Sequence, residues 1–330
     1  HALDRRQRQM CIRDSNLTMG QGPKDGKNER NPVKSALNAF KFRSIGPAFM
    51  SGRIADIAID PKNENVWYVA VGSGGVWKTE NSGTTWTPLA DNMPFYSTGC
   101  ITIDPHNNAS IWLGTGENVG GRHVGIGHGV YHSKDGGKSW KDMGLKKSEH
   151  ISKIIVHPDD PNTVWVASQG PLWSPGGERG LFKTTNGGKT WKNTLDINEW
   201  TGVTDLVIDP NNPNILYAAS WQKHRNVAAL IGGGPGTSLY KSVDGGDNWS
   251  KIDKGLPKSN KGKIGLAISP MQPNVLYAAV ELDKRAGAVY RSDNSGGSWK
   301  KMSDTVSGGT GPHYYHCLLY TSDAADDLTR

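Results

Sequence analysis

TENSGTTW, residues Thr79–Trp86, is the stretch that decides the fold, because it recurs along the chain. Four further copies follow: SKDGGKSW (Ser133–Trp140), TTNGGKTW (Thr184–Trp191), SVDGGDNW (Ser242–Trp249) and SDNSGGSW (Ser292–Trp299). The closing tryptophans are 50 to 58 residues apart, and a period of about fifty is typical of propellers and related repeat folds. An aromatic residue stands two positions before each copy, as at the end of a strand: Trp77, Tyr131, Phe182, Tyr240 and Tyr290.

A second pattern repeats in register with the first. Each copy contains an apolar β-branched strand, a short Pro/Asn turn and another apolar strand: Ile54–Ala70, Cys100–Gly114, Ile151–Ala167, Val203–Ala219 and Ile264–Ala279. Together with one strand before the eight-residue segment and one starting at its tryptophan, each repeat holds four strands. The sequence therefore predicts an all-β propeller of four-stranded antiparallel blades, at about residues 54–92, 99–144, 151–195, 203–254 and 264–303.

The eight-residue segment has a mechanical interpretation. The acid or amide at its third position can accept backbone N–H groups in a tight turn: Asn81, Asp135, Asn186, Asp244 and Asn294. Its glycine permits a positive φ: Gly83, Gly137, Gly188, Gly246, and in the fifth copy either Gly296 or Gly297. Its tryptophan can wedge between blades: Trp86, Trp140, Trp191, Trp249 and Trp299. We expect these residues to be structural.

Both flanks are expected to be foreign to the native protein. RRQRQMCIRDS (Arg5–Ser15) and CLLYTSDAADD (Cys317–Asp327) can be encoded on opposite strands of one short DNA. No structural rule produces that relation, so we interpret residues 1–15 and 317–330 as translated sequencing adapter. Residues 16–39 then form a linker, and residues 40–316 contain a propeller fragment that stops inside its ring.

Composition excludes several classes of protein. The 42 glycines, 18 prolines and 12 tryptophans suit short strands and tight turns. No apolar run reaches the roughly 18 residues of a membrane span. The lysines behind the net charge of +7 are spread over the repeats, which argues against a nucleic-acid groove. Only Cys100 lies between the two flanks, so no disulfide is expected there.

Metal and cofactor motifs are weak. His123, His128 and His132 are spaced like metal ligands, but His132 occupies a position where the other repeats have Lys or Arg. We therefore expect His132 to be an exposed strand residue. The glycine run at 232–236 lacks the following helix that phosphate binding needs. We predict no metal and no cofactor.

The eight-residue segments match the Asp-box (BNR) repeat of sialidases, xyloglucanase-type glycosidases and the sortilin-type receptor domain. SIGPAFMSGRI (Ser44–Ile54), GTGENVGGRHVG (Gly114–Gly125), QGPLWSPGGERGL (Gln169–Leu181) and SGGTGPHYY (Ser307–Tyr315) extend the match. From about Phe40 to Tyr315 the chain resembles large bacterial sortilin N-terminal-like (VPS10-type) or BNR glycosyl-hydrolase-like proteins. The resemblance implies a longer multi-bladed chain, whose remainder would be a partner, and an extracytoplasmic or secreted location.

Propeller topology predicts which face binds. The turns between the first and second strands and the Asp-box turns are short and uniform, whereas the loops between second and third strands (the b–c loops) are long and individual. Rigid scaffolds usually carry their function on such loops. The ligand-binding candidates are the polar and aromatic residues on or near this face: Arg53, Asn118, Arg122, His123, Trp173, Arg179, Trp221, His224, Arg225, His313 and Tyr314.

Two functions remain open. The favoured one is a non-catalytic binding or scaffold propeller with a peptide or glycan ligand on the b–c loop face. The alternative is a sialidase-like or xyloglucanase-like glycoside hydrolase, which needs two carboxylates roughly 5–9.5 Å apart. Its candidates are the loop acids Glu117, Glu178, Glu281 and Asp283. The two are told apart by whether two of these acids share a cleft or instead pair with Lys and Arg.

Overall fold

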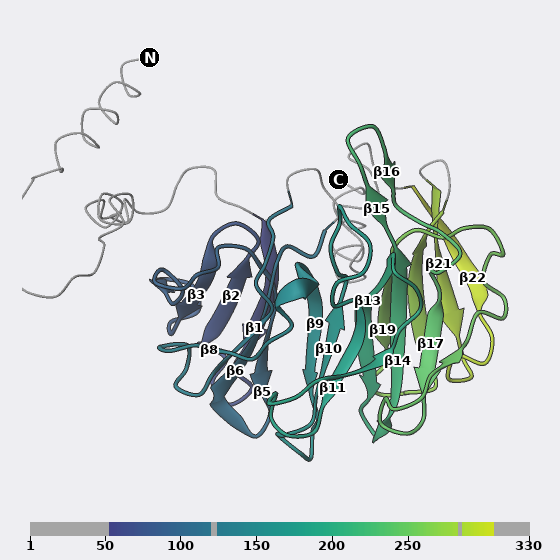
Figure 1. The fold of residues 1–330 in the computed structure, drawn as a ribbon. Helices are drawn as coiled ribbons and strands as arrows, with labels where there is room; N and C mark the ends of the chain where they lie inside the picture. Colours follow the sequence, from purple (N-terminus) through teal and green to yellow (C-terminus); the bar gives the residue numbers. More distant parts are fainter. Residues whose placement is uncertain (1–52, 120–123, 283–285, 307–330) are drawn as a thin grey trace, which may run out of the picture. The chain divides into compact units, whose positions relative to one another are not determined.

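The computed structural model describes residues 53–119, 124–282 and 286–306, with side chains as far as residue 304. These residues form five four-stranded antiparallel sheets, one after another along the chain (Figure 1). The chain divides into His1–Met50 and Ser51–Arg330, and every described strand belongs to the second unit. Each sheet keeps its four strands in sequence order, as propeller blades do, so the predicted fold class is confirmed.

The blades have the following strands. Blade one contains β1 (Ile54–Ile59), β2 (Trp67–Val71), β3 (Gly75–Thr79) and β4 (Thr87–Pro88). Blade two contains β5 (Thr98–Asp104), β6 (Asn107–Thr115), β7 (Val130–Ser133) and β8 (Lys141–Asp142). A short 3₁₀ helix, η1 (Lys146–Ser148), leads to blade three, with β9 (Ile151–Val156), β10 (Val164–Ser168), β11 (Gly180–Thr184) and β12 (Lys192–Leu195).

Blade four contains β13 (Thr201–Asp209), β14 (Asn212–Gln222), β17 (Leu239–Ser242) and β18 (Ser250–Lys251). A separate two-stranded hairpin, β15 (His224–Arg225) and β16 (Leu230–Ile231), stands in its b–c loop (Figure 1). Blade five contains β19 (Ile264–Ile268), β20 (Leu276–Glu281), β21 (Ala286–Ser292) and β22 (Lys300–Val306). Within the described residues no helix is long and apolar enough to cross a bilayer.

The first strands of the blades pack against one another in sequence order, β1 on β5, β5 on β9, β9 on β13 and β13 on β19. A side-chain hydrogen bond crosses each of these contacts. Asp56 and Asp205 each accept the N–H of a residue in the next blade, Ile101 (3.0 Å) and Leu266 (2.7 Å). The other two contacts use hydroxyl donors, Thr102 to the Ile154 carbonyl (2.8 Å) and Ser152 to the Val203 carbonyl (3.1 Å).

The hydrophobic cores lie between blades. One core, for example, joins Tyr217 of blade four to Leu266 of blade five, and another joins Cys100 of blade two to Ile154 of blade three. Burial raises the pKa of the Cys100 thiol. Second strands are the most deeply buried elements, because neighbours cover both of their faces, and all five residues of β10 are buried.

The Asp-box turns carry the predicted bonds. In the first copy Thr79 Oγ1 donates to Asn81 Oδ1 (3.0 Å) and accepts the Gly83 N–H (2.9 Å), while the Thr85 N–H donates to Asn81 Oδ1 (2.8 Å). The same three bonds recur in the other four copies. In the fifth copy the glycine is Gly296, with φ +81°, so the alignment on Gly297 is wrong.

The box tryptophans reach the preceding blade. The indole Nε1 donates from Trp140 to the Leu89 carbonyl (3.1 Å), from Trp191 to Met143 (2.7 Å) and from Trp299 to Ile252 (2.8 Å). Trp249 instead bonds Gly246 in its own box, while Trp165 of blade three donates to Gly245 of blade four (3.0 Å). A tryptophan bond therefore crosses every described blade interface, made by Trp140, Trp191 and Trp299 of the boxes and by Trp165 between blades three and four.

Candidate ligand-binding face

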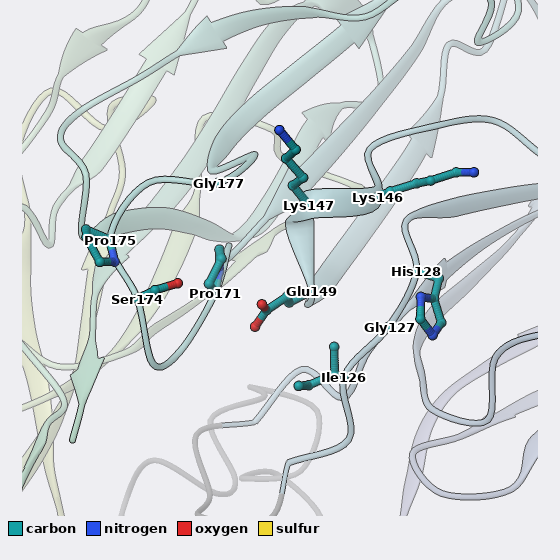
Figure 2. A pocket seen from close by; sticks show the side chains of 10 residues that line it. All are labelled: Ile126, Gly127, His128, Lys146, Lys147, Glu149, Pro171, Ser174, Pro175 and Gly177. Atoms are coloured by element: carbon teal, nitrogen blue, oxygen red, sulfur yellow. The ribbon is translucent and has the colours of Figure 1, made fainter. Parts of the chain in front are cut away.

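A pocket lies on the b–c loop face, between blades two and three. It is an open hollow of about 390 Å³, a volume within the range of small-molecule sites. Three segments line it (Figure 2): 126–128 from the b–c loop of blade two, 146–149 from the connection through η1, and 171–177 from the b–c loop of blade three. Adjacent b–c loops and the blade connection thus meet on one face at this point.

Glu149 supplies the acidic group of the pocket. Its carboxylate points into the space between Ile126, Pro171 and Ser174 (Figure 2). The Glu149 backbone has φ +57°, which is uncommon for a residue with a side chain, and its carbonyl accepts the Gly127 N–H at 2.8 Å. Within the described part of the chain, no hydrogen bond or ion pair involves its carboxylate oxygens. The carboxylate is therefore available to a ligand.

Arg179 organises the loop that forms one wall of the pocket. Its buried guanidinium donates to the carbonyls of Gly176 (2.8 Å), Gln169 (2.8 Å), Ser174 (2.7 Å) and Pro171. Burial lowers the pKa of Arg179 to about 10, and the charge of Glu149 opposes that shift. Arg179, a predicted ligand candidate, thus shapes the pocket through backbone carbonyls.

A second buried cation stands near Glu149. Lys223 is fully buried and donates to Gln169 Oε1 at 2.6 Å. Burial lowers its pKa well below the usual value, the nearby charges of Arg179 and Lys263 lower it further, and Glu149 acts in the opposite direction. The negative charge of Glu149 therefore raises the pKa of both Arg179 and Lys223, against the effect of burial.

Three of the four candidate catalytic acids lie within the described residues, and each already has a partner. Glu117 is buried in an ion pair with Arg53, which donates from Nε at 2.6 Å, and it also accepts the Gly125 N–H at 3.3 Å. Glu178 accepts the Lys147 N–H at 2.7 Å.

Glu281 is buried and accepts the Lys263 N–H at 3.0 Å. Burial raises the pKa of Glu281 to about 7. Asp283 lies outside the described residues. None of the three described candidate acids lines the pocket.

The aromatic candidates divide into exposed and buried side chains. Trp173, next to the pocket residue Ser174, is 48% exposed, and the Arg225 guanidinium lies 5.7 Å from its ring centroid. The His224 ring lies 3.9 Å from that of Trp200. Trp221, in contrast, is fully buried and donates to the Gly232 carbonyl at 2.8 Å, as a core residue does.

Asn118 connects distant blades. Its side chain donates to the Gly99 carbonyl (2.9 Å), and its own carbonyl accepts Gln169 Nε2 (3.0 Å) and Lys263 Nζ (2.9 Å). These bonds join the second, third and fifth blades in one polar cluster. The remaining ligand candidates, Arg122, His123, His313 and Tyr314, lie outside the described residues.

The histidine expectation needs one correction. His132 is half-buried rather than exposed, because its ring stacks on Trp112 at 4.1 Å and its Nε2 lies 2.8 Å from Ser110 Oγ. Burial lowers its pKa to about 4, so the ring is neutral at physiological pH. His128, by contrast, lines the pocket. Sequence reasoning missed the pocket residues Glu149 and Ser174, and the only signal for Glu149 was its place in a blade connection on the ligand-binding face.

Comparisons with known proteins agree with this fold. Residues 128–255 match the family model described as "Sortilin, neurotensin receptor 3". A xyloglucanase of Hypocrea jecorina is 22% identical over 307 residues, covering 84% of this chain and 35% of the enzyme. The rice photosystem II stability/assembly factor HCF136, chloroplastic, is 28% identical over 194 residues, covering 50% of this chain and 41% of that protein.

Among solved structures, an ancestral GH74 enzyme superposes with a TM-score of 0.60 at 25% identity, covering 76% of this chain and 31% of the enzyme. The fold and its turns define an Asp-box β-propeller. It resembles the sortilin domain and glycosyl-hydrolase-like propellers, and it spans between 19% and 35% of the length of the curated xyloglucanases that it matches.

Proposed function

We propose that this propeller binds a carbohydrate on its b–c loop face without cleaving it, with the pocket around Glu149 as one subsite. The observation that carries the proposal is that the described residues of the pocket supply a single carboxylate, that of Glu149. Glycoside hydrolysis requires a pair of carboxylates flanking the scissile bond. The described loop acids Glu117, Glu178 and Glu281 make contacts with the protein itself instead.

The chemistry of the pocket suits a sugar. Glu149 offers a charged acceptor for hydroxyl groups, and charge-assisted hydrogen bonds are the stronger ones. The rings of Pro171 and Pro175 and the side chain of Ile126 supply apolar walls. Trp173, next in the chain to Ser174, adds an exposed ring face on which a pyranose can stack. The printed names of the xyloglucanase relatives make xyloglucan oligosaccharides the first probe.

Calorimetric titration of the chain with xyloglucan oligosaccharides tests the proposal. We expect Glu149→Gln to raise the Kd by at least about tenfold, because it removes one charge-assisted acceptor worth about 1.5–3 kcal/mol. Glu80→Gln is the matched control, since Glu80 lies in an Asp-box turn and pairs with Lys78. Equal affinity of the Glu149→Gln variant and the unchanged chain would exclude the pocket as the site.

Hydrolysis is the second candidate, favoured by the names of the relatives. An assay for new reducing ends on the same oligosaccharides decides it, with Glu117→Gln and Glu281→Gln as the informative variants. We expect no release above the buffer rate. Release that either variant abolishes would replace binding with catalysis.

Two further points belong to the proposal: a peptide as the other ligand class to be tested, and an extracytoplasmic location. A peptide that competes with the sugar, and whose affinity also depends on Glu149, would change the ligand class but leave the site in place. Fractionation of cells that express the native full-length gene measures the location. We expect the protein outside the cytoplasm.

A further inference from the structure

Among the described residues, no neighbouring blade covers one face of blade one, whereas the matching face of each later blade is covered. Ile57 of β1 is 49% exposed, whereas the residues at the same repeat position in the other blades are at most 7% exposed: Ile101, Ile154, Leu206 and Leu266. Each of those residues packs against the blade that precedes it. Trp86 is likewise 40% exposed, in contrast to 5% for Trp299.

Blade five has the complementary face, which no described blade covers. Tyr277 and Val289 are half-buried, although the residues at their repeat positions in blade one, Tyr68 and Val76, are buried under blade two. Met302 stands three residues after the box tryptophan, which is the position of the carbonyls that accept the next blade's indole: Leu89, Met143 and Ile252. The Met302 side chain is 52% exposed.

The two faces therefore present the two halves of an interface that the molecule already forms internally. We propose that blade one of one copy docks on blade five of a second copy, with the Trp86 indole donating to the Met302 carbonyl. Ile57 would pack against Tyr277 and Val289, as Ile101 packs against Tyr68 and Val76.

This contact is heterologous, because it joins two different surfaces and leaves one of each unused. Two copies would bring ten blades together, more than the four to eight that propellers usually close. The docking therefore extends into open chains of copies instead of ending at a closed dimer. Burial of exposed apolar surface drives it.

Sedimentation velocity on mixtures of two variants tests the proposal. Ile57→Asp disables blade one and Met302→Asp disables blade five, and both changes lie at exposed side chains, so each variant should keep the melting temperature of the unchanged chain. The control is Val227→Asp, which adds the same charge on the loop between β15 and β16, at a side chain that is 92% exposed.

We expect the unchanged chain and the Val227→Asp control to form a concentration-dependent series of oligomers over about 1 to 100 µM, and each single variant to need at least about tenfold more protein to do so. An equimolar mixture of the two variants retains one intact pair of faces, so it should form dimers and stop there. A monomeric unchanged chain, single variants that associate as it does, or a mixture that stays monomeric would overturn the proposal. Should Met302→Asp prove too mild, Tyr277→Ala removes the neighbouring aromatic side chain.

Discussion

The two faces of the propeller use hydrogen bonds in opposite ways. On the Asp-box face, the same three bonds are repeated five times, each within eight residues. On the b–c loop face, bonds join residues far apart in sequence and differ from blade to blade, as with Arg53 and Glu117 or Lys263 and Asn118. The repeated face stabilises the blades, whereas the individual face can specialise for a ligand.

Replacement of a box glycine should show the largest effect. Gly246 has φ +84°, and a Cβ there would lie 2.7 Å from Trp165 Nε1. Gly246→Val should cost at least about 3 kcal/mol in the free energy of unfolding, from backbone strain and overpacking together. Urea denaturation measures it. Gly176→Ala on the loop face is the control, since φ is +70° but nothing lies within 4 Å, and about 1 kcal/mol is expected. Equal costs would mean that the two faces tolerate change alike.

Arg179 tests the loop face itself. Arg179→Met leaves four carbonyls without their guanidinium donor, so the wall of the pocket should loosen, at a cost of about 2–3 kcal/mol. Sugar affinity should fall together with stability. A variant that melts earlier yet binds sugar normally would separate the pocket from this loop. Urea denaturation and calorimetric titration of the same preparation supply the two values.

Glu281 predicts a pH dependence on the loop face. Its pKa is raised to about 7 in the fold, so the folded state holds a proton that the unfolded state has released above its ordinary pKa of 4.5. The stability contributed by this group is therefore lost as the pH rises from about 4.5 to 7, by up to about 3 kcal/mol. Glu281→Gln should flatten the dependence of unfolding free energy on pH in that window. If the pH dependence were unchanged, Glu281 would already be ionised in the folded protein in this pH range.

The smallest effect is expected from an Asp-box acid. Hydrogen bonds from the Ser139 side chain and backbone lower the pKa of Asp135 to about 2. Its contribution is present above the unfolded pKa of 3.8 and is lost as the pH falls toward 2, and solvent screening keeps it below about 1 kcal/mol. Asp135→Asn should remove this loss of stability at acid pH, and urea denaturation at pH 2 to 4 measures it. Asn186, already an amide in the next box, provides the internal comparison.

The repeated face could be predicted from sequence because the fold imposes one constraint five times. Trp140 and Trp191 were recognisable as staples from spacing alone, since their role needs only neighbours of the same type. At the interface between blades three and four, Trp165 rather than Trp249 makes the bond between blades. Nothing in the repeated sequence indicates this difference. Whether a position is open or covered depends on packing that the repeat does not encode.

The b–c loop face could be predicted as the place of a ligand site, but the residues that form the site could not. Arg53 and Glu117 were both candidates, yet they lie 64 positions apart and their pairing needed the fold. Glu149 was missed because its importance comes from a backbone with positive φ and from two buried basic side chains, Arg179 and Lys223, which have no signature in its neighbours along the chain. Trp221 resembled a ligand residue by type and proved to be buried.

The buried thiol of Cys100 can report local opening of the fold. It lies in the core shared by blades two and three, next to the side of the propeller that carries the pocket, and it is 1% exposed. An aromatic disulfide reagent can reach it only when these two sheets part, so in a chain with Cys11 and Cys317 replaced by serine the rate of modification measures that opening. A sugar bound between the same blades should slow this modification.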